Sequence, residues 1–295
     1  MKKWILYSLL LIVLTVILTS CTVQEKLLVG GCNWDQIAIV DKKTKAVEWT
    51  HQLQKGDDCN DLEITKSGNI LYAYKGGARL ITRGQEVIWD FKVEKGQELY
   101  TATELPTGEY LLAVCALPAR IITLNPKGEK VKEQNFDTGI ANVHGQFRQI
   151  LPTANNTYII PLMGKGEVIE LTQDGEVIHR IKVGGNPFSA KITADGNWIV
   201  ACGDAHRFVV VDPLKQLVKE QVSLSGNGKP SLLFVAETYG FKNGNVMIAN
   251  WGGHSKDKTQ PQLIEMDSKK EVVWTLEPST RINNISAVFP FKTKR

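Results

Sequence analysis

The sequence is poor in the residues and motifs that build a metal or nucleophile site. Four cysteines follow residue 21, and their spacing is too wide and irregular for a zinc pattern: Cys32, Cys59, Cys115 and Cys202. Cys115 and Cys202 lie in apolar runs, which is typical of buried thiols. The chain has no G-x-S-x-G nucleophile turn, no phosphate-binding glycine loop and no zinc-protease helix. It therefore lacks the sequence motifs of those enzyme classes.

Strong charge and helical periodicity are also missing. Lys and Arg number 35 against 31 Asp and Glu, and no basic run alternates with aromatic residues. Nothing therefore indicates a nucleic-acid partner. After residue 21 no segment keeps apolar residues at a helical spacing, whereas many segments alternate apolar with polar residues. That alternation is typical of β-strands and favours an all-β fold.

The first 21 residues differ from the rest. Lys2 and Lys3 precede an apolar run over 4–18, which ends in "LTSC" at 18–21. This order resembles a bacterial lipoprotein signal peptide over 1–20, and the resemblance implies cleavage before Cys21 and lipid on that residue. The alternative is an uncleaved anchor, although an apolar run over 4–18 falls short of the ~20 residues that a spanning helix needs.

The lipoprotein resemblance implies a place for the protein in the cell. A lipidated tether over 21–26 would hold the remaining chain to a membrane of the bacterial envelope, on its periplasmic or outer surface. Thr22 is not the Asp that marks inner-membrane retention, so the outer membrane is favoured in a Gram-negative source. An exported chain meets an oxidising compartment, so pairing of its cysteines stays open.

A motif of a tight turn followed by an alternating strand recurs along the chain. Its copies are "ITKSGNILYAY", "ELPTGEYLLAV", "LPTANNTYIIPL", "ITADGNWIVAC" and "GFKNGNVMIAN", with turn residues at Gly68, Gly108, Asn156, Gly196 and Gly244. Each copy is followed by a second strand, polar turn and strand, so each unit holds two hairpins. Four-stranded units that repeat at this length predict a β-propeller over 27–295.

The two chain ends complete the count of blades. Residues 27–53 supply three strands without an inner one, and residues 282–291 supply one strand without partners. Pairing them gives a sixth blade and removes the exposed sheet edges. The sequence therefore predicts a six-bladed propeller of four-stranded antiparallel blades, closed by pairing of the N- and C-terminal strands.

Two segments that end outer hairpins, "VDKKTKAVEW" and "MDSKKEVVW", each finish in a tryptophan. The first, with Asp41, Thr44 and Trp49, resembles the tryptophan-docking repeat of pyrroloquinoline-quinone-type propellers, although Lys45 replaces the usual glycine. The second is similar but one residue shorter, with Asp267 and Trp274. The resemblance implies that each tryptophan packs against the neighbouring blade. It does not extend to the quinone cofactor, because the dehydrogenases of that superfamily are longer and carry an adjacent cysteine pair that this chain lacks.

One face of the predicted propeller is richer in His, Asn and Trp than the other. The links between blades and the middle hairpin connections share this face, at the mouth of the central channel, and loops that depart from plain turn chemistry are where function concentrates. We expect ligand contacts from ten residues on it: Trp34, Asn60, Glu98, His144, Gln146, Asn186, His206, Trp251, His254 and Asn284.

His144, in "NVHGQFRQI", is the candidate for catalysis if the protein is an enzyme. We expect it at the start of an inner strand, pointing into the channel, where a histidine can act as acid, base or metal ligand. Bacterial arylsulfotransferases, which are six-bladed propellers, place a catalytic histidine at their centre. The alternative is a hydrogen-bonded loop histidine without a catalytic role.

Calcium is the one candidate cofactor that the sequence indicates. An oxygen-rich ring in the channel would resemble that of calcium-dependent lactonase-like propellers, and its members would be Glu98, Asn142, Asn186, Glu237 and Asn284. The alternative is that these polar side chains bind only water.

Two functions from different classes follow. The first is a non-catalytic envelope module that binds a carbohydrate, peptide or protein through its channel-mouth face, because exposed Trp beside polar residues suits such contacts. The second is an enzyme at the same mouth, either a calcium-dependent lactonase or esterase or an arylsulfotransferase-like enzyme. A fold alone implies no chemistry, so the binding module is the favoured hypothesis.

Overall fold

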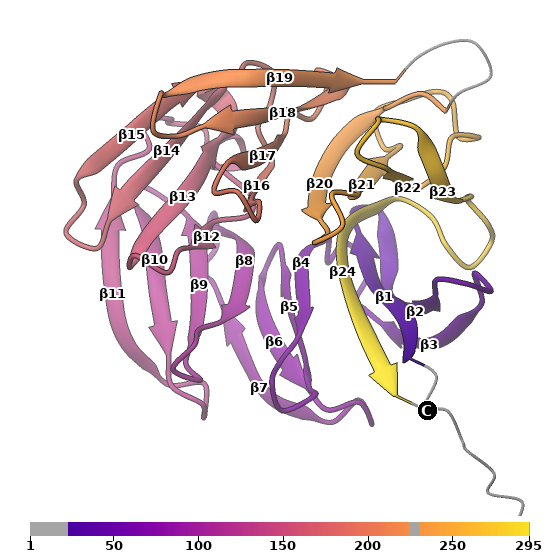
Figure 1. Ribbon diagram of the computed structural model, residues 1–295. Coiled ribbons are helices and arrows are strands. Elements are labelled where there is room, and N and C mark those ends of the chain that lie inside the picture. Colours follow the sequence, from indigo (N-terminus) through magenta and orange to yellow (C-terminus); the bar gives the residue numbers. More distant parts are fainter. Residues whose placement is uncertain (1–22, 225–229, 295) are drawn as a thin grey trace, which may run out of the picture.

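The chain folds into a ring of six four-stranded antiparallel sheets, as predicted (Figure 1). The computed structural model describes residues 23–224 and 230–294. The predicted signal peptide and Cys21 lie outside these residues. Within the described residues, no helix is long and apolar enough to span a bilayer. The blades follow in chain order. In blades 2 to 6 the first strand lies nearest the channel, and in blade 1 the last strand of the chain takes that place.

The sheets are numbered as blades 1 to 6. Blade 1 contains β24 (Ile285–Lys294), β1 (Val23–Gly31), β2 (Trp34–Asp41) and β3 (Val47–Gln52). Blade 2 contains β4 (Cys59–Ile64), β5 (Ile70–Tyr74), β6 (Gly77–Ile81) and β7 (Val87–Lys92). Blade 3 contains β8 (Glu98–Glu104), β9 (Tyr110–Cys115), β10 (Ala119–Leu124) and β11 (Lys130–Phe136).

The second half of the ring repeats this order. Blade 4 contains β12 (Leu151–Pro152), β13 (Thr157–Leu162), β14 (Glu167–Thr172) and β15 (Val177–Lys182). Blade 5 contains β16 (Ser189–Ile192), β17 (Trp198–Ala201), β18 (Arg207–Asp212) and β19 (Leu217–Ser223). Blade 6 contains β20 (Phe234–Gly240), β21 (Val246–Trp251), β22 (Leu263–Met266) and β23 (Val272–Leu276). Two short 3₁₀ turns, η1 (Val143–Gly145) and η2 (Met163–Lys165), flank β12 and β13.

The predicted closure is confirmed in blade 1. β24 pairs with the whole of β1, from Val23 opposite Lys294 to Gly31 opposite Ile285. β1 begins before the expected propeller boundary at residue 27, because the last residues of β24 supply it with a partner strand. Gly31 permits this contact, since a Cβ there would lie 1.8 Å from the Asn284 carbonyl oxygen.

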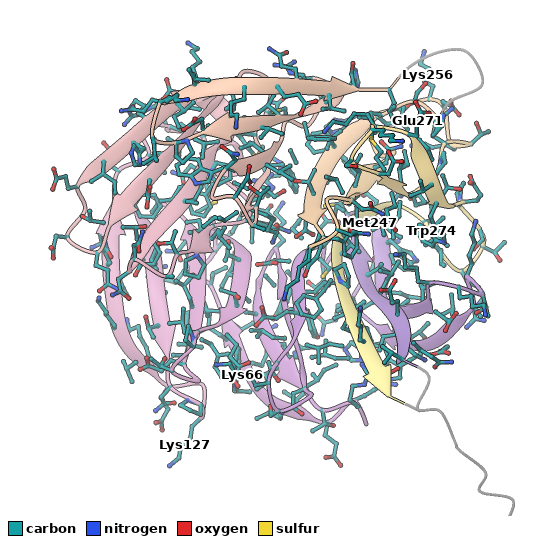
Figure 2. All side chains as sticks on the ribbon, in the orientation of Figure 1. Lys66, Lys127, Met247, Lys256, Glu271 and Trp274 are labelled. Carbon is teal, nitrogen blue, oxygen red and sulfur yellow. The ribbon has the colours of Figure 1, made fainter. Side chains whose placement is uncertain are left out.

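The predicted turns and docking tryptophans are also present. The turn glycines have positive φ, from 80° at Gly196 to 88° at Gly108, which other residues rarely adopt. The Trp49 indole N–H donates to the Arg83 carbonyl of blade 2 at 3.1 Å, and that of Trp274 donates to the Lys42 carbonyl of blade 1 at 2.9 Å. The apolar core accordingly lies between neighbouring blades, and in Figure 2 Met247 and Trp274 mark the part between blades 6 and 1.

Acidic side chains accept hydrogen bonds from backbone N–H groups at the inner edges of the sheets. The channel-side edge of each first strand has amides without a strand partner, and such groups need acceptors. The Asp61 carboxylate of β4 accepts the Ala102 N–H of β8 at 3.1 Å, and the Glu237 carboxylate of β20 accepts the Val288 N–H of β24 at 2.8 Å. These carboxylates line an inner cavity of about 160 Å³ together with Lys191, which pairs with Glu237 at 2.8 Å.

Candidate functional site

A cavity of about 410 Å³ opens at the channel mouth. It is lined by residues of the links between blades and of the middle connections, which come from all parts of the chain between Cys32 and His254. Hydrogen-bonded charged groups lie on one side and aromatic rings on the other. In Figure 2, Lys256 of the β21–β22 connection lies at one end of the view and Lys66 and Lys127, in polar turns, at the other.

The charged side is built around His144. Its ring Nδ1 lies 2.8 Å from Glu98 Oε2, and the Tyr100 hydroxyl donates to the same oxygen at 2.8 Å. His144 lies on η1, where Asn142 accepts its backbone N–H, and not at the start of an inner strand as expected. Since β12 begins only at Leu151, the blade link is long enough to form this turn and leave the imidazole largely exposed.

Glu98 fixes the proton on the His144 ring. Burial alone would raise the Glu98 pKa, but hydrogen bonds from His144 and Tyr100 outweigh it and lower the pKa to about 2. Lys75 adds an ion pair at 3.2 Å. An ionised Glu98 accepts the Nδ1 proton, which leaves the Nε2 lone pair to accept a hydrogen bond from Arg148 Nη2 at 3.1 Å.

Arg148 is the member of this group that we did not predict from the sequence. Only 4% of the residue is exposed, yet it lines the mouth cavity. Its Nη1 donates to the carbonyls of His144 and Phe147 at 2.8 and 2.9 Å, and its guanidinium carbon lies 4.0 Å from the Tyr100 ring centroid. The available sequence signal was its position four residues after His144, in the same link between blades.

The aromatic side is a chain of edge-to-face contacts. The ring centroids of Phe188 and Phe234 lie 5.1 Å apart, those of Phe234 and Trp251 5.2 Å, and those of Trp251 and His254 4.7 Å. The His254 Nδ1 lies 3.0 Å from Asp204 Oδ1, which orients the imidazole against the indole. The Trp251 indole N–H donates to the Cys32 carbonyl at 3.2 Å and so anchors blade 6 to blade 1.

The third part of the cavity wall is polar and unreactive. The Asn33 N–H donates to Asp58 Oδ1 at 2.7 Å, and the Cys32 thiol donates to Asn60 Oδ1 at 2.8 Å. Burial and the neighbouring Asp58 charge raise the Cys32 pKa to about 12, so the thiol is protonated and not a nucleophile at neutral pH. All four cysteines of the described residues are free thiols.

Comparisons with known proteins place the chain among solved propellers. Residues 31–271 match the family described as Mal s 1 allergenic protein-like. The chain belongs to this family. A solved protein of unknown function from Bacteroides caccae shares 38% identity with this Mal s 1-like chain, at a TM-score of 0.86 over 91% of this chain and 99% of that one. No curated protein matches.

More distant solved structures share the fold alone with the Mal s 1-like chain. A streptogramin B lyase has 9% identity and a TM-score of 0.61 over 92% of this chain and 98% of that one. An inactive histidine variant of virginiamycin B lyase from Staphylococcus aureus, solved with quinupristin, has 11% identity and a TM-score of 0.59. It aligns over 89% of this chain and 91% of that one.

The structure brings five of the ten expected contact residues of this Mal s 1-like propeller to the mouth cavity: Asn60, His144, Asn186, Trp251 and His254. Glu98 is not part of the cavity lining but is hydrogen-bonded to His144, which is. Gln146 is fully buried and holds the Ala116 backbone through its amide, and His206 Nδ1 lies 2.7 Å from the Leu233 carbonyl oxygen. Trp34 packs against the core of blades 1 and 6, and Asn284 donates to the Asn33 carbonyl at 3.2 Å. These four therefore support the loops around the cavity.

The expected oxygen ring is not assembled. Glu98 lies near the mouth, whereas Glu237 lines the inner cavity and pairs with Lys191. Asn142 caps η1 and Asn284 binds a blade connection, so these side chains do not meet at one point. Over residues 23–224 and 230–294, no three His, Cys, Asp or Glu side chains are grouped as metal ligands.

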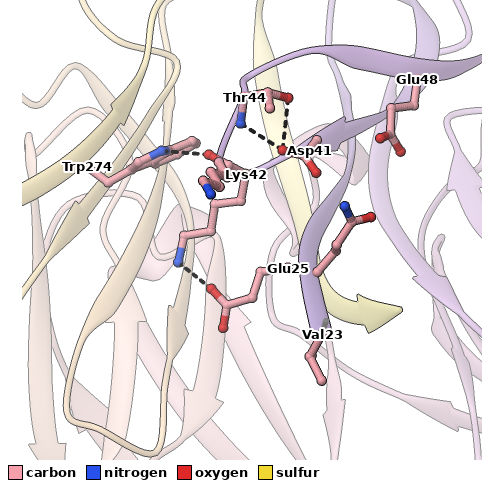
Figure 3. A pocket seen from close by; sticks show the side chains of 9 residues that line it. Val23, Glu25, Asp41, Lys42, Thr44, Glu48 and Trp274 are labelled. Atoms are coloured by element: carbon pink, nitrogen blue, oxygen red, sulfur yellow. Dashed lines mark hydrogen bonds and ion pairs between the residues drawn. The ribbon is translucent and has the colours of Figure 1, made fainter. Parts of the chain in front are cut away.

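A larger cavity of about 790 Å³ lies on the opposite face, beside Val23 (Figure 3). Several of its polar groups are bound within the cavity wall. Trp274 donates to the Lys42 carbonyl, the Lys42 ammonium lies 3.1 Å from Glu25 Oε2, and Asp41 accepts from the Thr44 N–H at 2.7 Å. This cavity belongs to the closure of the ring, where blades 6 and 1 meet.

Proposed function

We propose that this Mal s 1-like propeller is a non-catalytic binding module that takes a carbohydrate, a peptide or a protein segment into the channel-mouth cavity. The observation that carries the proposal is the aromatic wall of Phe188, Phe234 and Trp251 facing fixed polar groups across about 410 Å³. Ligand sites are typically concave, about 300–1,000 Å³ in volume, and combine apolar walls with a few placed polar groups.

The proposal includes attachment to a bacterial envelope membrane through lipid on Cys21. β1 runs from Val23, two residues after Cys21, to Gly31, and Cys32 and Asn33 then enter the mouth cavity. At ~3.3 Å per strand residue the mouth lies roughly 30 Å from the start of the strand. A lipid anchor at Cys21 would thus hold the opposite face toward the membrane and turn the mouth toward the ligand.

Attachment predicts how a Cys21→Ala variant behaves. The wild-type protein, expressed with its full leader, is expected in the membrane fraction and in the detergent phase of a Triton X-114 partition. The variant loses the lipid-bearing thiol and is expected to leave the detergent phase. Equal partition of both proteins into the detergent phase would remove lipid on Cys21 from the proposal.

The binding role is tested by ligand arrays on matched variants. Purified wild-type protein is applied to glycan and peptide arrays, and each ligand captured is titrated against Trp251→Leu and against Trp89→Phe. Trp251 lines the mouth, whereas Trp89 lies between blades 2 and 3. We expect at least tenfold weaker binding for Trp251→Leu and unchanged binding for Trp89→Phe, with each protein titrated well below its own melting temperature because Trp251→Leu also removes the bond to the Cys32 carbonyl. Equal binding by all three proteins would show that the mouth is not the site.

The second candidate is an enzyme at the same mouth, and the His144–Glu98 pair favours it. An imidazole hydrogen-bonded to a carboxylate is a common acid–base arrangement. However, Arg148 donates to the Nε2 that would act as base, so this nitrogen is occupied in the resting structure. Purified protein assayed with an aryl sulfate donor and a phenol acceptor, and with lactones in calcium, tests this role. Turnover that a His144→Ala variant loses would establish the enzyme, and turnover that it keeps would exclude His144.

A further inference from the structure

We infer that the mouth cavity recognises an organic monocarboxylate with an aromatic or apolar arm, and that Arg148 binds its carboxylate. This inference rests on the proposed binding function and names the ligand class for the same site. Arg148 is 4% exposed and lines the cavity, and within the described part of the chain no carboxylate lies within ion-pair distance of its guanidinium.

A buried charge without a counter-charge is unusual in a folded protein. Buried guanidinium groups are nearly always paired, because removal from water is costly unless an opposite charge compensates. Glu98 contacts the same His144 ring as Arg148 but is already bound to His144, Tyr100 and Lys75. The cavity therefore keeps an excess positive charge on this side, which an anionic ligand would neutralise.

The hydrogen bonds of Arg148 leave part of its donor capacity free. Nη1 donates to the His144 and Phe147 carbonyls, and Nη2 donates to the His144 ring, which accounts for three of the five guanidinium N–H groups. The two that remain are on the neighbouring atoms Nε and Nη2. Two adjacent N–H donors match the two oxygens of a carboxylate.

The guanidinium is also held in place before any ligand arrives. Its carbon lies over the Tyr100 ring at 4.0 Å and over the Phe188 ring at 5.5 Å, and two backbone carbonyls hold Nη1. A donor group fixed in its bound geometry loses little conformational entropy on binding. Phe188 continues into Phe234 and Trp251, so apolar surface for the arm of the ligand begins where the carboxylate site ends.

Two carboxylates elsewhere in the lining limit the charge of the ligand. Asp58 and Asp204 line the same cavity, and the Asp204 side chain is 45% exposed. These carboxylates repel a dianion and attract a positively charged group on the ligand. A monocarboxylate, including an amino acid or a peptide C-terminus, therefore fits this cavity better than a phosphate ester.

Three small probes that share a phenyl ring test the inference: phenylacetate, phenylacetamide and phenyl phosphate. Each is titrated into the lipid-free wild-type protein at low ionic strength, and binding is followed by calorimetry. We expect phenylacetate to bind at least tenfold more tightly than its neutral amide and than phenyl phosphate, and we expect added salt to weaken phenylacetate binding. The comparison needs no variant, so it stands even if Arg148 substitutions fail to fold.

Variants then assign the effect to Arg148. Arg148→Gln should bind acid and amide equally, whereas Arg207→Gln, which removes an arginine outside the cavity, should keep the preference. Equal binding of acid and amide by the wild-type protein would overturn the inference and leave the binding function standing. Tighter binding of phenyl phosphate would also overturn it. If no probe binds and the arrays capture nothing at the mouth, both the inference and the proposed function fall.

Discussion

Two acidic residues at different depths of this channel have very different affinities for protons. The Glu98 pKa is lowered to about 2 by its hydrogen bonds from His144 and Tyr100, despite burial. Burial raises the Asp61 pKa to about 8, and the negative charges of Glu237 and Glu63 add to this rise while Lys191 opposes it. Near neutral pH the same side-chain chemistry is therefore ionised at Glu98 and protonated at Asp61.

The raised Asp61 pKa predicts a pH dependence of stability. The folded state keeps the Asp61 proton up to about pH 8, whereas the unfolded chain releases it near pH 4, so stability falls as pH rises between these values. One proton of difference gives a slope of ~1.4 kcal/mol per pH unit. Asp61→Asn should lack this slope between pH 5 and 7 and should be more stable than wild type at pH 9. Urea unfolding of both proteins across this range measures it, and parallel curves would contradict it.

Glu98 predicts the opposite sign. Its pKa is depressed when the protein folds, so its contribution is present above about pH 4.5 and is lost as the pH falls toward 2. Because the site is partly open to solvent, screening reduces the effect to about 1–2 kcal/mol. Glu98→Gln should be less stable than wild type by that amount at pH 7, and the difference should disappear near pH 2. Thermal unfolding at the two pH values provides the comparison.

At this scale candidate residues can be predicted from the sequence, but the side chains that contact them cannot. His144 stands out as a histidine in a polar link, but Glu98 is 46 residues away and reaches it only through the packing of adjacent blades. Arg148 was missed because a buried, unpaired guanidinium cannot be told from a solvated one by residue type. Residues such as Gln146 were expected at the ligand and instead hold loops, since an Asn or Gln in a link serves either role.

At the scale of elements, the turn residues and the repeated tryptophans predicted the blades well. Gly and Asn turns fix positive φ locally, so they can be recognised without knowing the fold. The lengths of inner strands were harder to predict, because β12 contains only two residues and the link before it folds into η1. That link departs from the repeat where it carries His144 and Arg148.

The docking tryptophans predict a contrast between two similar substitutions. The Trp274 indole N–H has an acceptor, the Lys42 carbonyl at 2.9 Å, whereas that of Trp89 is buried without one. Trp274→Phe should lower the free energy of unfolding by about 1 kcal/mol, the usual net value of a hydrogen bond. Trp89→Phe removes an unsatisfied donor and should cost less. Chemical denaturation measures the free energy of unfolding of both variants. An equal or larger decrease for Trp89→Phe would show that the bond to the Lys42 carbonyl contributes nothing.

At the scale of the whole molecule, the ring depends on a strand from the far end of the chain. β24 pairs along the full length of β1 and supplies the channel-side edge of blade 1. Removal of residues 285–295 would expose that edge and the core residues that Ala287 and Val288 contact. We therefore expect the truncated protein to unfold without cooperativity and to self-associate. Light scattering after size exclusion would reveal this, and a monomeric truncated protein with an unchanged melting temperature would refute closure by β24.

The location of the binding site is tested most directly by the tryptophan indole signals in an NMR spectrum. Trp251 lines the mouth cavity, Trp274 lines the cavity on the opposite face, and Trp49 and Trp89 lie between blades. Protein labelled with ¹⁵N at its indoles is titrated with phenylacetate and with each ligand that the arrays capture. A site at the mouth predicts that the Trp251 signal shifts in a saturable manner while those of Trp274, Trp49 and Trp89 stay in place. A shift of Trp274 with Trp251 unmoved would contradict it and place the site on the opposite face.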